Sequence, residues 1–200
     1  NGYQFVSSGD TEVIIKAYHY WGESCVTRFD GMFAFAIWDK NKKSLFLARD
    51  RMGIKPLYYT LHNNVFRFAS HPQALLAAGA VDKRIDPVSL HHLFSLHGVI
   101  PAPRTILQGI HKCTPGHSLT VSDGKVSGEK NYWSLNDIPI DTLRSEQEWQ
   151  QEIRMHLLDA VNKRLRASDV PVGVLLSGGL DSSLLVALLS ELEIDVLHTF

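Results

Sequence analysis

The sequence is poor in cysteine, and it has neither a long apolar run nor a stretch of concentrated positive charge. Its two cysteines, Cys25 and Cys113, lie far apart without C-x-x-C spacing, so the sequence predicts neither a disulfide framework nor a thiolate metal site. The longest apolar runs, residues 32–38 and 184–189, fall far short of the roughly 20 residues that cross a bilayer. The first ten residues lack the basic-then-apolar order of a signal peptide. We therefore expect a cytoplasmic protein with no membrane partner.

Charge is balanced, because 20 Lys and Arg residues stand against 21 Asp and Glu residues. No segment gathers the basic side chains into a stripe, so nucleic acid is not an expected partner. Three of the ten histidines, His91, His92 and His97, lie close in sequence, but no H-E-x-x-H or carboxylate pattern accompanies them. They indicate structural histidines rather than a metal site. The 200 residues, 44% of them hydrophobic, are enough for one large folded domain or two small ones.

The first 80 residues carry the pattern of an antiparallel sheet with flanking helices. The expected elements are a helix over residues 11–29, strands over 33–39, 45–50, 57–61 and 65–70, and a helix over 72–78. Asp10 or Ser8 is expected to cap the first helix. The pair Asn63-Asn64 suits a hairpin turn that needs positive φ. Residues 79–87 are a plausible domain boundary because turn-forming residues gather there.

The region that follows is expected to be a connector with a hairpin. It contains a predicted helix over residues 87–97 and a predicted hairpin over 118–133, with Ser122-Asp123-Gly124 as its turn. Ser145 and Glu148 have the spacing of a capping box, which predicts the start of a long amphipathic helix that packs on a sheet.

The last region predicts the opening βαβ unit of a parallel sheet. A short apolar strand over residues 170–176 meets a tight glycine turn, a helix over 180–192 follows, and a second strand begins at Val196. Because a parallel sheet needs several such units to cover its faces, we expect the chain to be a fragment of a larger protein.

The glycine turn between strand and helix carries the strongest chemical signal in the sequence. Its residues are Ser177, Gly178, Gly179, Leu180, Asp181, Ser182 and Ser183. Glycines let the backbone approach an anion, the first N–H groups of the helix lack intrahelical acceptors, and the helix dipole favours negative charge. A phosphate group suits this place, the serine hydroxyls add donors, and Asp181 is a candidate ligand for Mg²⁺. No P-loop lysine accompanies the turn.

The S-G-G-x-D-S pattern resembles the pyrophosphate-binding loop of the ATP pyrophosphatases, which cleave ATP between its α- and β-phosphates. The resemblance implies that ATP binds at Leu176 and at the seven turn residues from Ser177 to Ser183. The structural alternative is a βα turn that uses small residues for close packing. We favour the binding role because the pattern stands in the strand-turn-helix context that it requires.

Four upstream segments, residues 8–14, 29–36, 48–59 and 68–70, look like the class II glutamine amidotransferase domain of glutamine-dependent asparagine synthases. The resemblance covers nearly the whole chain. It implies an α+β glutaminase of the N-terminal nucleophile type, with antiparallel sheets, followed by the start of an α/β parallel-sheet ATP pyrophosphatase domain. The implied domains are the C-terminal part of the glutaminase over 1–80, the connector over 81–144, and the start of the ATP-binding domain over 145–200. Residues 85–109 look most like the N-acetylglutaminylglutamine amidotransferase branch.

This family implies a division of chemical labour. An N-terminal cysteine releases ammonia from glutamine, and a second domain adenylates a carboxylate that ammonia then captures. The implied small molecules are glutamine, ATP with Mg²⁺, and an acceptor such as aspartate or a dipeptide, and the resemblance allows a homodimer. Asp10 matches the aspartate that binds the α-amino group of glutamine, although it can also serve as a helix cap.

Departures from the family pattern limit the inference. The chain begins with Asn1, and neither Cys25 nor Cys113 can replace an N-terminal cysteine, because the family mechanism uses the free α-amino group of that residue. We therefore assign no catalytic residue within these 200 residues and expect this chain alone to be inactive. Arg49, Asp50 and Lys55 are expected to fix a turn by ion pairing and are left out of the site.

Two further alternatives remain open at the level of sequence. One is a β-lactam synthetase type of enzyme, in which the same two domains occur without the nucleophile. The other is a non-enzymatic nucleotide-binding module that retains the scaffold.

Overall fold

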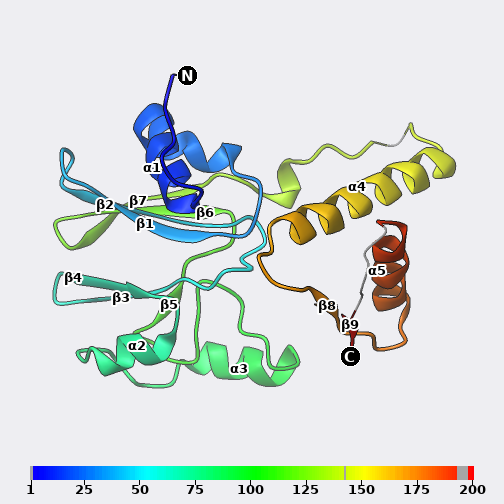
Figure 1. Ribbon diagram of the computed structural model, residues 1–200. Coiled ribbons are helices and arrows are strands. Elements are labelled where there is room, and N and C mark those ends of the chain that lie inside the picture. The colour runs from blue at the N-terminus through cyan, green and yellow to red at the C-terminus, as the bar shows by residue number, and fades with distance from the viewer. Residues whose placement is uncertain (1, 142, 193–197) are drawn as a thin grey trace. The chain divides into compact units, whose positions relative to one another are not determined.

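The computed structural model describes residues 2–141, 143–192 and 198–200, and these form two compact units, Asn1–Ile138 and Pro139–Phe200 (Figure 1). The division lies after Ile138, close to the boundary that the sequence implies between residues 144 and 145 and well after the one that it suggests within residues 79–87. The difference arises because strands from the predicted connector pair with strands from the first region, so that the connector's hairpin belongs to the first unit. No helix in the described part of the chain is long and apolar enough to cross a membrane.

The first helix, α1 (Asp10–Trp21), is shorter than the predicted helix over residues 11–29. Gly22 follows it with a φ of 60°, a left-handed conformation that ends the regular hydrogen-bond ladder. The chain continues as a 3₁₀ helix, η1 (Gly22–Arg28), which buries Cys25 and Val26. The glycine was a sequence signal for this break.

The first unit contains two antiparallel sheets. The four-stranded sheet has the order β1 (Ala34–Asp39), β2 (Ser44–Arg49), β6 (His117–Ser122), β7 (Lys125–Asn131), and the three-stranded sheet has the order β4 (Val65–Ala69), β3 (Tyr58–His62), β5 (His111–Lys112). Asn63 and Asn64 both have positive φ in the β3–β4 turn, as do Asp123 and Gly124 in the β6–β7 turn. Both predicted hairpin turns are therefore confirmed.

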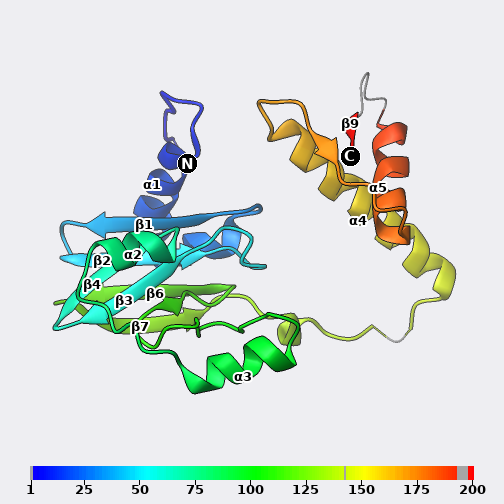
Figure 2. The same cartoon turned by 90° about the horizontal axis from the view of Figure 1, so that it is seen from below.

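Helices cover the outer sides of the two sheets in this unit. In Figures 1 and 2, α1 lies against the four-stranded sheet and α2 (Pro72–Ala77) lies on the outer side of the three-stranded sheet. The third helix, α3 (Pro87–Ser95), starts at Asp86, whose carboxylate accepts hydrogen bonds from the Val88 and Ser89 N–H groups at 2.8 and 3.1 Å. This cap fixes the start of α3 at the predicted residue, and the helix ends two residues before the predicted end.

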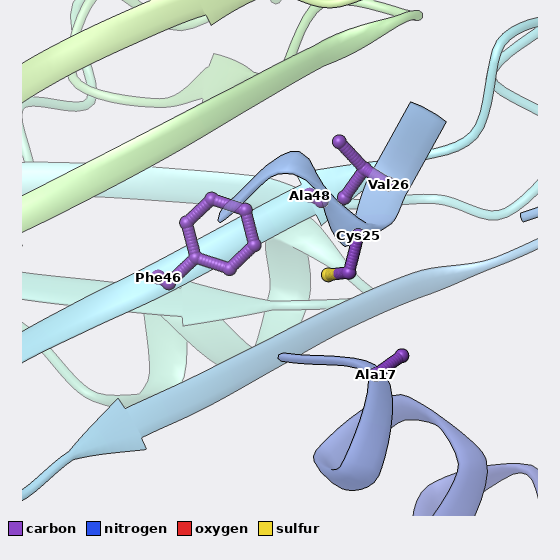
Figure 3. Packing of buried hydrophobic residues seen from close by; sticks show 5 residues of the cluster. All are labelled: Ala17, Cys25, Val26, Phe46 and Ala48. Carbon is purple, nitrogen blue, oxygen red and sulfur yellow. The ribbon is translucent and has the colours of Figure 1, made fainter. Parts of the chain in front are cut away.

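Alternation along β2 explains how the unit builds two cores from one strand. Phe46 and Ala48 face α1 and η1, and Figure 3 shows them beside Ala17, Cys25 and Val26. Leu47 points to the opposite face, where it packs in a second cluster. The other buried members of that cluster are Leu57, Cys113, Leu119 and Val121.

The second unit is a long helix followed in the chain by a small βαβ arrangement. Its elements are α4 (Glu146–Arg166), β8 (Gly173–Val174), α5 (Leu180–Glu191) and β9 (His198–Thr199). The capping box of Ser145 and Glu148 is confirmed at the start of α4. β8 and β9 pair in parallel, as predicted, but β8 is much shorter than the expected strand over residues 170–176. The predicted strand start, Val196, lies outside the described residues.

Candidate functional site

The S-G-G-x-D-S segment lies in the second unit, between the end of β8 and the first turn of α5. Gly178 has a φ of 78°, and Gly179 is the N-cap residue, with extended backbone and no side-chain cap. The Leu176 N–H donates to Phe200 O at 2.8 Å, so the chain leaves the parallel pair immediately before the turn. Gly178 therefore meets a backbone requirement, since a residue with a side chain is strained at this φ.

Hydroxyl groups organise the inside of this turn. The hydroxyls of Ser177 and Ser182 lie 3.1 Å apart, and the Ser182 hydroxyl also donates to Gly179 O at 3.2 Å. The Ser183 N–H makes the first regular bond of the helix, to Gly179 O at 3.1 Å. The preceding N–H groups of the first turn have no acceptor within the helix. The turn thus offers backbone donors and hydroxyls at the positive end of a helix dipole.

The Asp181 side chain is exposed in the first turn of α5, and within the described residues its carboxylate makes no hydrogen bond or ion pair. A carboxylate in this position can help hold a divalent cation, provided that other oxygen ligands come from a bound phosphate. The described part of the chain contains no group of three or more His, Cys, Asp or Glu side chains that could hold a metal by itself. The residues present thus fit Mg²⁺ only as an ion shared with a nucleotide.

An apolar cavity of about 340 Å³ lies elsewhere in the second unit, between α4, β8 and α5. It is lined by Val161, Arg164, Leu165, Val172, Gly173, Val174, Leu175, Leu185 and Leu189. None of the seven turn residues contributes to it. The candidate anion site is therefore an exposed turn rather than the wall of this cavity.

Asp10, the candidate glutamine-binding residue, is the first residue of α1 in the first unit. It does not cap the helix, and neither does Ser8: the N-cap residue is Gly9, and no side chain caps it. The predicted cap was therefore wrong. The Asp10 side chain is exposed, and across the described residues its carboxylate has no hydrogen-bond or ion-pair partner. The carboxylate is consequently free to meet a cation.

Glu12, two residues further along α1, was missed at the sequence level. Its carboxylate accepts hydrogen bonds from the Val6 N–H at 3.0 Å, the Ser7 N–H at 2.6 Å and the Ser7 hydroxyl at 2.6 Å, and it forms an ion pair with Lys16. The hydrogen bond from Lys16, followed by that from the Ser7 hydroxyl, lowers the pKa of Glu12 to about 2. Its place at the third helical position was the available signal, but Gly9 at the N-cap hid the usual spacing pattern.

Arg49 and Asp50 fix the turn after β2, but they do so through the main chain. The Arg49 guanidinium donates to the carbonyls of Gly53, Lys55 and Cys113 at 2.6, 2.8 and 2.8 Å. The buried Asp50 carboxylate accepts from the Ile54 and Lys55 N–H groups, both at 2.9 Å. The predicted structural role is confirmed, while the predicted ion pairing is replaced by hydrogen bonds to the backbone.

Both thiols are buried in the packing of the first unit. Cys25 is 0% exposed and Cys113 is 1% exposed. Burial raises the pKa of the Cys25 thiol to about 11 and that of the Cys113 thiol to about 12. A buried neutral thiol is a poor nucleophile, so neither cysteine can act as one here.

Two family models match the chain in consecutive segments. A glutamine amidotransferase domain matches residues 1–133, and an asparagine synthase domain matches residues 152–200. The first match covers most of the unit that ends at Ile138. The second begins inside α4 and includes the glycine turn.

Several curated proteins are similar along nearly the whole chain. Asparagine synthetase [glutamine-hydrolyzing] 1 of Bacillus subtilis is 40% identical over 191 residues, which are 95% of this chain and 29% of that protein. A putative asparagine synthetase of Methanocaldococcus jannaschii is 40% identical over 96% of this chain and 37% of its own length. Amidase chry2 of Gibberella zeae is 38% identical over 95% of this chain and 28% of its length. The chain thus spans about a third of the length of these relatives, and it belongs to the glutamine-dependent asparagine synthase family.

Proposed function

We propose that this chain is part of a larger amide ligase that hydrolyses glutamine and uses ATP. In this reaction a carboxylate acceptor is adenylated, pyrophosphate leaves, and ammonia from glutamine displaces AMP to give the amide. The observation that carries the proposal is the glycine turn at the start of α5, whose sequence matches the asparagine synthase model and whose backbone presents donors for an anion. The acceptor is aspartate in an asparagine synthetase, or a dipeptide in the related branch.

In this proposal, the turn from Ser177 to Ser183 binds the pyrophosphate part of ATP. The turn leads into the start of α5, whose first N–H groups have no acceptor within the helix, and the Ser177 and Ser182 hydroxyls lie close enough together to contact one phosphate group. Mg²⁺, when bound, offsets charge that develops on the leaving pyrophosphate, and Asp181 is the residue that would hold it. Leu176, at the end of the strand segment, borders the nucleotide.

Asp10 is proposed to serve the other half of the reaction. Its exposed carboxylate has no internal partner among the described residues and can bind the α-ammonium group of glutamine. Because both thiols are buried and neutral, neither Cys25 nor Cys113 is assigned as the nucleophile that attacks glutamine.

The test is ATP–pyrophosphate exchange in the full-length protein with Asp181→Asn. We expect exchange to fall by about two orders of magnitude, the scale of losing one electrostatic contact to the transition state. Asp169→Asn is the matched control, because Asp169 is also an exposed aspartate of the second unit and lies outside the turn. Exchange at the wild-type rate in Asp181→Asn would remove this carboxylate from the proposed site.

A further inference from the structure

The segment before α1 lies along this helix and is held by three of its side chains, which follow one another at intervals of about one turn. Glu12 binds the backbone at Val6 and Ser7, Lys16 donates to Gln4 O, and the His19 ring bonds the Tyr3 hydroxyl. The Lys16 ammonium also lies 4.4 Å from the centre of the Phe5 ring. We call residues 3–7 the clamped segment. Its path is fixed from one face of α1, because positions four or three residues apart share a face.

Glu12 makes most of the hydrogen bonds that hold the clamped segment, and of the three side chains it lies nearest to Asp10 in the sequence. Its two carboxylate oxygens receive three N–H bonds and one hydroxyl bond from Val6 and Ser7, at 2.6 to 3.2 Å. Only Ser8 and Gly9 separate these anchored residues from Asp10. The backbone that leads into Asp10 is therefore fixed on its N-terminal side by Glu12 and on its C-terminal side by the helix.

The two carboxylates in the first turn of α1, those of Asp10 and Glu12, differ in whether their negative charge has a partner. Glu12 is compensated by Lys16 and by the hydrogen bonds it accepts, while Asp10 has no such partner in the described chain. An incoming ammonium group will meet the uncompensated carboxylate, because the negative charge of Glu12 is already satisfied.

We propose that Glu12 is a positioning residue for glutamine. By anchoring Val6 and Ser7, it fixes the chain that leads into the first residue of α1, Asp10, whose carboxylate binds the α-ammonium group. The inference rests on the proposed glutamine-binding role of Asp10. Glu12 itself touches no substrate. Its contribution is the geometry of Asp10, and a loss of geometry weakens substrate binding more than it weakens the synthetase reaction.

The experiment compares glutamine-dependent with ammonia-dependent amide synthesis in the full-length protein. In Glu12→Ala we expect the KM for glutamine to rise about tenfold and the rate with ammonia to stay unchanged, because ammonia bypasses the glutaminase. In Glu12→Gln, which keeps one acceptor oxygen, we expect a rise of about threefold. Asp10→Ala is expected to raise the KM for glutamine 10- to 100-fold, as loss of a charged hydrogen bond does.

Glu148→Gln is the matched control. Glu148 also accepts bonds from a backbone N–H and a hydroxyl, both of Ser145, at the start of a helix, but it belongs to the second unit. This variant should leave the ratio of the two activities unchanged. Because Glu12→Ala can also unfold the helix start, ammonia-dependent synthesis and the thermal unfolding midpoint are recorded for every variant.

The outcomes separate the two proposals. An unchanged KM for glutamine in Asp10→Ala would overturn the proposed role of Asp10. A raised KM in Asp10→Ala together with an unchanged KM in both Glu12 variants would overturn the positioning role alone. Equal loss of both activities in Glu12→Ala and Glu12→Gln would make Glu12 a general stabiliser of the fold and would overturn the positioning role as well.

Discussion

Arg49 and Asp50 illustrate how adjacent charged residues can serve the main chain instead of each other. Their side chains make hydrogen bonds to the main chain of four residues, Gly53, Ile54, Lys55 and Cys113. The Tyr132 hydroxyl also donates to Arg49 O at 2.5 Å. Gly53 completes this turn at a φ of 66°, and a Cβ atom there would lie 2.7 Å from Pro115 Cγ. The charges are thus used for a rigid turn.

Asp50→Ala is expected to lower the free energy of unfolding by about 2 to 4 kcal/mol, because it removes the acceptors of two N–H groups at a site that is 1% exposed. Urea unfolding measures the change. Asp50→Asn, which retains one acceptor oxygen, should cost less, and Asp137→Ala at an exposed position serves as the control. A cost below about 0.5 kcal/mol for Asp50→Ala would contradict this account, since that is the scale of a surface substitution.

The two thiols are expected to resist modification in the folded protein. Cys25 and Cys113 are buried and neutral, so a thiol reagent at pH 8 should label them at least about 100-fold more slowly than in urea. Labelling of either thiol in the folded protein at the rate of a free cysteine would show that the core opens easily. Single Cys→Ala variants assign the rates to each residue.

The same thiols predict how stability changes at alkaline pH. Burial keeps their pKa values near 11 and 12, whereas an unfolded thiol ionises near pH 9. Above pH 9 the unfolded chain therefore binds fewer protons than the folded chain, and the free energy of unfolding falls as pH rises toward 11. Urea midpoints from pH 7.5 to 10.5 measure this fall. It should be smaller in Cys113→Ala, and an identical slope in that variant would contradict the assignment.

Elements with strong local signals were predictable from the sequence, and the exceptions have identifiable causes. The asparagine pair and the Asp123-Gly124 pair predicted their hairpins because both need positive φ, which few residues adopt readily. The helix over residues 11–29 was overextended because apolar spacing alone does not register a left-handed glycine at position 22. The glycine turn was located correctly, but the contacts of Glu12 with Val6 and Ser7 could not be predicted, because the three-dimensional path of the chain brings these residues together.

Gly178→Ala tests whether ATP–pyrophosphate exchange depends on the backbone conformation of the glycine turn. The φ of 78° strains a residue with a Cβ atom by about 1 to 2 kcal/mol, so the turn should shift its N–H groups and ATP–pyrophosphate exchange should fall by about tenfold. Gly128→Ala is the control, because Gly128 has no left-handed φ and a Cβ atom there would meet only Thr120 Cβ at an ordinary 3.8 Å. Full exchange activity in Gly178→Ala would mean that the backbone of this turn does not need its present shape.

The whole molecule consists of two units with very different cores. The first unit buries residues on both faces of a four-stranded sheet, whereas the cluster of the second unit has four buried members among its described residues, Val161, Val174, Leu188 and Leu189. The sequence predicted the change of architecture from antiparallel to parallel strands. It implied one boundary between residues 144 and 145, close to the division after Ile138. The boundary that it suggested within residues 79–87 falls inside the first unit, because the long-range pairing of β6 with β2 is not visible in local patterns.

This contrast predicts unequal protection in the 200-residue chain. Apolar side chains of the second unit remain exposed, with Leu175 at 80%, Leu180 at 84% and Phe200 at 79%, and an apolar cavity lies beside its small core. Few buried contacts mean a low free energy of local opening. We therefore expect slow amide exchange in the strands within residues 34–69 and fast exchange in β8 and α5, measured on material confirmed as monomeric. Strong protection of α5 in that monomer would contradict this expectation. It would show that the small core of the second unit holds the βαβ unit closed without a second molecule.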